Sequence, residues 1–139
     1  MHILNKASKE QIRQIDNLRY DREPTAKQKE RMSLDTSWFN IDDIYSLLSP
    51  PPKNTSQITM NELAHLEKMT SSLSDEDVDL IKMADHHMYD MFENFCKENG
   101  LEYKDGPITT LVHQADAVTL KLKYHFNRPR PEQLKQFTG

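Results

Sequence analysis

The feature that most constrains the fold is the run of residues 108–128, which lies between two prolines and contains no glycine or proline. Its apolar residues recur at helical spacing on one face, and Leu120 and Tyr124 extend the apolar surface to a second face. A helix that is apolar on more than one side is usually central in its domain. Pro107 suits a first helical turn, and Pro129 cannot continue a helix. The sequence therefore predicts one long, central, buried helix near the C-terminal end.

The remaining pattern is also helical. Only three glycines occur in 139 residues, which disfavours a turn-rich β protein. Further helices are predicted over residues 8–18, 42–48, 56–70 and 75–99. The first begins with a capping box from Ser8 to Gln11, and Ser74 caps the last. The second is expected to turn four side chains inward: Ile41, Ile44, Leu47 and Leu48. The fold class expected is all-α, a helical bundle.

Two parts of the chain differ in composition. Residues 1–36 are predicted to form a polar N-terminal arm with one short helix, and residues 37–139 to form the helical domain. Within this N-terminal segment, residues 21–36 are highly charged and have little apolar content, so an extended or mobile connection is expected. Trp38 and Phe39 restart the apolar content and are predicted to anchor the N-terminal segment in the core.

Composition excludes several classes of protein. The formal net charge of −4 gives no electrostatic footprint for nucleic-acid binding. Cys96 is the single cysteine, so no internal disulfide can form, and its place in an apolar helical pattern favours a packed thiol over a nucleophile. The N-terminus lacks the apolar run of a signal peptide, and no apolar stretch approaches the roughly 20 residues of a membrane span. A soluble, cytoplasmic protein is expected.

Lys121 and Arg128 are the most informative charges. They are seven residues apart, so a continuous helix would bring both to one face, within about 20° of each other. A planar guanidinium fork and a lysine point charge on one face suit a tetrahedral oxyanion such as phosphate. The alternative is that both are solvated charges at a helix C-terminus, where cations are favoured in any case.

The stretch Lys121-Leu-Lys-Tyr-His-Phe-Asn-Arg-Pro129 matches a K-x6-R-P motif. Upstream stand Pro-Pro-Pro-Lys-Asn-Thr at residues 50–55, Glu-Leu at 62–63 and Asp-Glu-Asp-Val at 75–78. Together these elements resemble soluble, bacterial or phage-like members of the type-2 phosphatidic acid phosphatase and vanadium haloperoxidase superfamily. The resemblance covers residues 40–139.

That resemblance implies the N-terminal part of an α-helical bundle, with Lys121 and Arg128 as phosphate-binding residues. It implies a metal-independent acid phosphatase that hydrolyses phosphoric monoesters, and no cofactor beyond phosphate or vanadate in the anion site. The expected partner is a phosphorylated small molecule or another oxyanion. A vanadium-dependent haloperoxidase is the lesser alternative.

The chain departs from the family pattern in one major respect. It contains neither the P-S-G-H-like motif nor the S-R-x5-H-x3-D-like motif, which in the family supply the acid, the nucleophilic histidine and further anion ligands. No catalytic residue is therefore expected within this chain, which would be either a piece of a longer enzyme or a natural short form. The alternative is a non-catalytic, truncated helical protein that acts by association with a partner or with itself, as a homo-oligomer.

Three further residues are candidates for the pocket around the anion. His113 could line the same cavity, or could be a buried, hydrogen-bonded histidine. Arg130 could contact a substrate, or could bond nearby carbonyl groups. Asn127 could reach the pocket, or could bond backbone at the helix end. No metal site is predicted, because the histidines lack three or four converging ligands.

Overall fold

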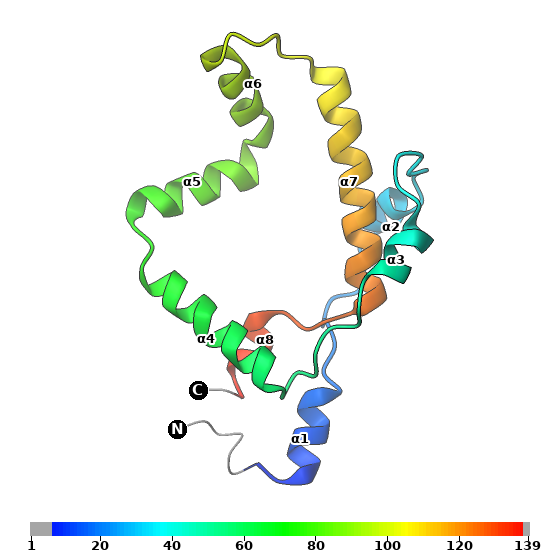
Figure 1. Cartoon of the computed structure of the whole chain (residues 1–139), viewed down its shortest axis with the longest axis vertical. Helices are drawn as coiled ribbons and strands as arrows, with labels where there is room; N and C mark the ends of the chain where they lie inside the picture. The colour runs from blue at the N-terminus through cyan, green and yellow to red at the C-terminus, as the bar shows by residue number, and fades with distance from the viewer. Residues whose placement is uncertain (1–6, 138–139) are drawn as a thin grey trace.

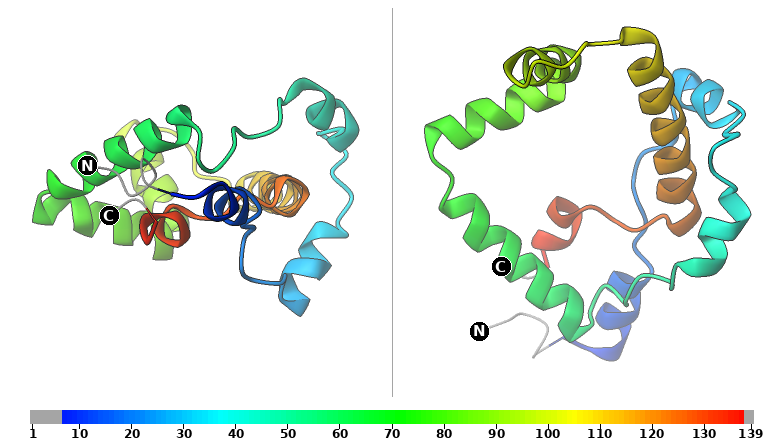
Figure 2. Two further views of the ribbon diagram at one scale, coloured as in Figure 1. Left: turned by 90° about the horizontal axis from the view of Figure 1, so that it is seen from below. Right: turned by 45° about the horizontal axis from the view of Figure 1, so that its top comes forward.

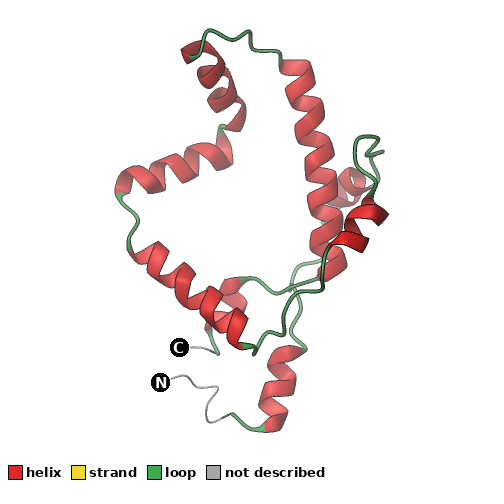
Figure 3. Ribbon diagram, in the orientation of Figure 1, coloured by secondary structure: helices red, strands yellow, loops and turns green. Residues whose placement is uncertain are grey.

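The computed structural model describes residues 7–137, and within this range all regular structure is helical (Figures 1 and 3). The elements follow in the order α1 (Lys9–Asp16), α2 (Ala26–Met32), α3 (Ile41–Leu47), α4 (Gln57–Ser71), α5 (Asp75–His86), α6 (Met88–Glu98), α7 (Asp105–Phe126) and α8 (Pro131–Lys135). The predicted all-α class is confirmed.

Most helix starts follow from their caps. In α1 the Ser8 hydroxyl accepts from the Gln11 amide, and the Gln11 side chain accepts from the Ser8 amide, so the predicted capping box is confirmed. Thr25 and Gln28 form the same reciprocal pair at the start of α2. The prediction of an extended connection over residues 21–36 was therefore wrong, because this cap nucleates a helix among mainly charged residues.

The long helix predicted from Asp75 to about Asn99 is two helices. His87 separates α5 from α6, with φ −130° and ψ 36°, which are not helical values. Ser74 caps α5 as expected, by accepting from the Asp77 amide. The break changes the direction of the chain, so α5 and α6 run at an angle to each other (Figure 1).

The predicted long helix near the C-terminal end is α7, which spans 22 residues and carries α2 and α3 along its side (Figure 1). Arg31 on α2 donates to Asp116 on α7 at 2.7 Å, and the Trp38 amide donates to the Gln114 side chain at 3.2 Å. Trp38 itself is 56% exposed, so its predicted role as a core anchor was wrong. Trp38 is held to α7 through its backbone amide instead.

The helix α7 is less buried than its apolar pattern predicted. Among its residues only Ala117 and Leu120 are buried, and Leu111 is 47% exposed. The inward face predicted for α3 was also wrong in part, since Leu47 is 81% exposed. Both helices therefore present apolar side chains to solvent in this chain.

The best-packed region, which we call the junction, consists of residues 15–20, 54–60 and 127–134. Here α1, the start of α4, the end of α7 and α8 come together (Figures 1 and 2). The Asn54 side chain, 5% exposed, donates to the Ile15 carbonyl at 2.8 Å and to the Leu18 carbonyl at 3.2 Å. Seven residues of the junction are buried: Ile15, Tyr20, Asn54, Thr59, Met60, Pro129 and Leu134.

The segment of residues 61–104, which we call the arm, is the least buried part of the described chain. It comprises most of α4, then α5, α6 and the following loop, and it curves away from the junction before the chain returns through α7 (Figures 1 and 2). No residue of the arm is buried, and α5 and α6 pack mainly against each other. The position of Cys96 within the arm is half-buried, not the fully packed site that its pattern predicted.

Among the helices of residues 7–137, none combines the length and the apolarity needed to cross a bilayer.

Candidate oxyanion site

Arg128 is placed by the end of α7. Asn127, the C-cap residue, has φ 49° and ψ 36°, a left-handed conformation that asparagine tolerates better than most residues. Its amide donates to the Lys123 carbonyl at 2.9 Å, and its carbonyl accepts from the Tyr20 amide at 3.1 Å. Asn127 thus ends the helix through its backbone and turns Arg128 out of the helical path. Pro129, which is buried, follows at once.

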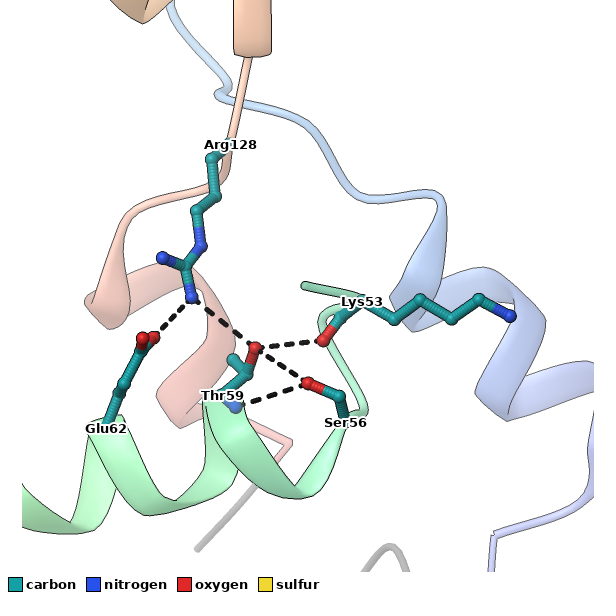
Figure 4. A network of polar contacts seen from close by, with 5 residues as sticks. All are labelled: Lys53, Ser56, Thr59, Glu62 and Arg128. Carbon is teal, nitrogen blue, oxygen red and sulfur yellow. Dashed lines mark hydrogen bonds and ion pairs between the residues drawn. The ribbon is translucent and has the colours of Figure 1, made fainter. Parts of the chain in front are cut away.

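The Arg128 side chain crosses to the first turns of α4 (Figure 4). Its Nη2 donates to Glu62 Oε2 at 2.5 Å and to the Thr59 hydroxyl at 3.4 Å. Thr59 is 1% exposed, and its hydroxyl also donates to the Lys53 carbonyl at 2.9 Å. Because this buried hydroxyl is fixed by the turn before α4, the guanidinium group has a well-defined position.

Lys53 comes from the Pro-Pro-Pro-Lys-Asn-Thr stretch, and its side chain points away from Arg128 (Figure 4). The stretch supports the site through the Lys53 carbonyl, which accepts from Thr59, and through the side chains of Asn54 and Thr55. Asn54 is bonded to α1, and the Thr55 amide and hydroxyl both donate to Asp16, at 2.9 and 2.8 Å. The proline-rich segment therefore fixes the start of α4, and with it Thr59 and Glu62.

Arg128 borders two cavities. The smaller has a volume of about 150 Å³ and is lined by Thr59, Glu62, Leu63, Leu66, Arg128, Pro129, Pro131 and Leu134. The larger, of about 430 Å³, is open and lies between the end of α7 and the segment from Leu48 to Pro51. A drug-sized ligand typically needs about 300–1,000 Å³, so the smaller cavity suits a small ion.

Lys121 and Arg128 do not share a helical face, because the helix ends at Phe126 and Asn127 adopts the left-handed conformation. Lys121 is half-buried on α7, and it does not line either of the two cavities that Arg128 borders. The seven-residue spacing would bring both side chains to one face only if the helix continued to Arg128, and α7 ends before that residue.

A second group of cations surrounds Tyr20, which is 9% exposed. Lys123 Nζ lies 4.2 Å from the centre of its ring, and Arg130 Cζ lies 5.3 Å from it. The pKa of the Tyr20 hydroxyl is lowered below 10.0, chiefly by hydrogen bonding to Lys123, with Arg130 and Arg22 adding positive charge. Arg130 is thus a neighbour of Tyr20, and its amide donates to the Gln133 side chain at 2.9 Å.

His113 lies elsewhere. It is exposed, and with Asp116 it lines a cavity of about 320 Å³ between α7 and α2 that also includes Arg31. The reading of His113 as a buried histidine was wrong, and the cavity that it lines is not one of those bordered by Arg128. Within residues 7–137 no three histidine, cysteine, aspartate or glutamate side chains converge as metal ligands would.

Sequence reasoning missed the partners of Arg128. Glu62 and Thr59 are three residues apart on α4, so they share one face of that helix. The Glu-Leu pair at residues 62–63 was part of the resemblance, but nothing in it indicated that Glu62 faces the arginine. The pairing depends on how α4 crosses the residues after α7, which is long-range information.

Comparison of the chain with protein-family models, curated proteins and solved structures finds no match.

Proposed function

We propose that this chain is a phosphatase-like protein that binds a small oxyanion, with phosphate as the first choice and vanadate as its analogue, at Arg128. The observation that carries the proposal is the position of the Arg128 guanidinium group, which is anchored on buried Thr59 and borders a cavity of about 150 Å³. The K-x6-R-P motif and its resemblance to the type-2 phosphatidic acid phosphatase superfamily support the same choice of ligand.

Glu62 sets the energetics of this site. It neutralises Arg128 at 2.5 Å, while the two side chains are 46% and 36% exposed. An ion pair this exposed contributes at most about 1 kcal/mol, so an oxyanion with two or more charge-assisted hydrogen bonds can displace the carboxylate. Glu62 acts in this proposal as an internal competitor that keeps the affinity for anions low.

Hydrolysis needs groups beyond this site. Transfer of a phosphoryl group to a histidine requires a positioned nucleophile and an acid for the leaving oxygen, and the sequence lacks both family motifs that supply them. The proposal is therefore anion binding by this chain, with hydrolysis of phosphoric monoesters only where another segment supplies those motifs. Vanadium-dependent peroxidase chemistry would need the same addition. A cytoplasmic location belongs to the same proposal.

Calorimetric titration with inorganic phosphate tests the site. We expect Arg128→Ala to weaken phosphate binding by about 10- to 100-fold, because a hydrogen bond to a charged group contributes about 1.5–3 kcal/mol. Glu62→Gln should strengthen binding, since the amide no longer competes for the guanidinium group. Lys121→Ala should have a smaller effect than Arg128→Ala.

Arg19→Ala is the matched control, because Arg19 is an exposed arginine whose guanidinium group donates to the local carbonyls of Asp16 and Leu18. It should leave phosphate affinity unchanged. Equal losses in the Arg19 and Arg128 variants would reduce the effect to net charge, and unchanged binding in Arg128→Ala would refute the site.

A further inference from the structure

The chain leaves far more surface exposed than a compact chain of its size normally does. A compact monomer of 16.3 kDa has an accessible surface of about 7,500 Å². The chain exposes 10704 Å². The excess of about 3,200 Å² is larger than the roughly 1,000–2,500 Å² that each subunit contributes to an obligate dimer interface.

Exposed large hydrophobic residues are concentrated in the arm. Of the sixteen large hydrophobic residues that are exposed in residues 7–137, nine lie in the arm. They are Leu66, Met69, Leu73, Leu80, Ile81, Met83, Phe92, Phe95 and Leu101. Phe92 and Phe95 are three residues apart on α6 and share one face of the helix. Large apolar side chains exposed in this number on one segment mark an interaction site.

Charge indicates what covers the arm. Its sequence, residues 61–104, contains four lysines and eleven acidic residues, a net charge of −7, while the rest of the chain contains fourteen basic and eleven acidic residues, a net charge of +3. Three of the basic residues outside the arm, Lys123, Arg130 and Arg22, lie around Tyr20. Every copy of the chain therefore carries both an acidic apolar arm and a basic surface of opposite sign.

We propose that two copies of this chain form a two-fold symmetric dimer, in which the arm of each copy lies against the basic surface around Tyr20 of the other. A two-fold arrangement satisfies both arm-to-body contacts at once and closes the assembly. Burial of the apolar arm residues supplies the affinity, and opposite charge fixes the orientation.

The oligomeric state of the full chain tests the proposal by sedimentation equilibrium over a wide concentration range. We expect a mass of twice 16.3 kDa for the wild type. Phe95→Asp, at a position on α6 that is 59% exposed, should raise the dissociation constant at least tenfold. Leu47→Asp, on α3 and 81% exposed, is the matched control outside the arm and should leave the dimer intact. Circular dichroism checks that both variants keep their helices.

Charge reversal tests the arm-to-body pairing. Glu93→Lys with Glu98→Lys reverses the sign of charge at two positions of the arm, and Arg22→Glu with Arg130→Glu reverses it at two positions beside Tyr20. Each double variant alone should dimerise weakly, because like charges then meet at both contacts. An equimolar mixture should recover dimerisation, because in the mixed dimer both contacts join opposite charges.

Four results would overturn the proposal. A wild type that is monomeric at every concentration would mean that the arm is covered by a different partner or by nothing. Dimers equally stable in the Phe95 and Leu47 variants would place the interface elsewhere. Assembly that continues beyond two copies, or a mixture that does not recover dimerisation, would exclude the reciprocal arrangement.

Discussion

The junction and the arm are both built from helices with clear local start signals, yet of the two regions only the junction buries side chains. The arm helix α5 has a complete cap at Ser74 and three acidic residues in its first turn, while α8 in the junction has only five residues. Nevertheless Leu134 on α8 is 3% exposed and Leu80 on α5 is 55% exposed. Local sequence thus determines where helices form, and long-range contacts determine which of them contribute to a core.

The largest expected effect is in the cost of truncating a buried leucine of the junction, compared with truncating an exposed leucine outside it. Leu134→Ala should lower the free energy of unfolding by about 2–5 kcal/mol, because it removes buried methyl groups from the junction. Leu47→Ala, on α3 and 81% exposed, should change it by less than about 0.5 kcal/mol. Urea denaturation monitored by circular dichroism measures both. Equal effects would mean that the junction is not the core of this chain.

A smaller effect is expected at the turn that places Arg128. Asn127→Ala should destabilise the chain by about 1 kcal/mol, because alanine pays a steric cost at φ 49°. Asn127→Gly should stay within about 0.5 kcal/mol of the wild type, because glycine adopts this conformation freely. The pair is compared in the same denaturation experiment. A glycine variant as unstable as the alanine variant would show that the side chain of Asn127, and not its backbone conformation, supports the junction.

The smallest effect concerns the start of the arm. Hydrogen bonds from the backbone and side chain of Ser74 lower the pKa of Asp77 below 3.8. Because the folded-state pKa is the lower one, the ionised carboxylate stabilises α5 above pH 3.8, and this stabilisation is lost as the pH falls through the folded-state value. NMR chemical shifts of α5 should therefore report fraying in acid. Asp77→Asn should remove that part of the acid dependence, and an identical acid profile in the variant would contradict this account.

Features of the fold that depend on local sequence could be predicted, and features that depend on long-range contacts could not. The capping boxes and the proline-bounded helix near residue 126 were predictable, because each depends on neighbours within a few positions. The start of α2 had a readable signal in Thr25 and Gln28, which the charged composition of residues 21–36 obscured. The break at His87 has no glycine or proline to mark it, so residue types alone did not indicate it.

The inward faces were the weakest predictions. Helical periodicity shows which side chains share a face, but it does not show whether anything covers that face. Within residues 7–137, most of the Leu47 and Trp38 side chains is left uncovered, since they are 81% and 56% exposed. If a second copy covers the arm, the apolar pattern of residues 61–104 is correct for the assembly and misleading only for the single chain.

For the candidate site, the sequence predicted Lys121 and Arg128 as anion ligands but not the surroundings of Arg128. The motif gave the residue, and the left-handed Asn127 together with α4 gives its position. The seven-residue spacing to Lys121 could not reveal this geometry, because a spacing argument holds only while the helix continues. Predicting Glu62 as the partner would require knowing that α4 crosses the end of α7.

Hydrogen exchange at two protein concentrations tests the central claim most directly, namely that the junction is stable by itself while the arm depends on a second copy. The account predicts that the start of α4 near Met60, in the junction, is protected at both concentrations, whereas α5 and α6 exchange rapidly when dilute and become protected as concentration rises. An arm that is as protected as the start of α4 at the lowest concentration, or that remains unprotected at the highest, would contradict it.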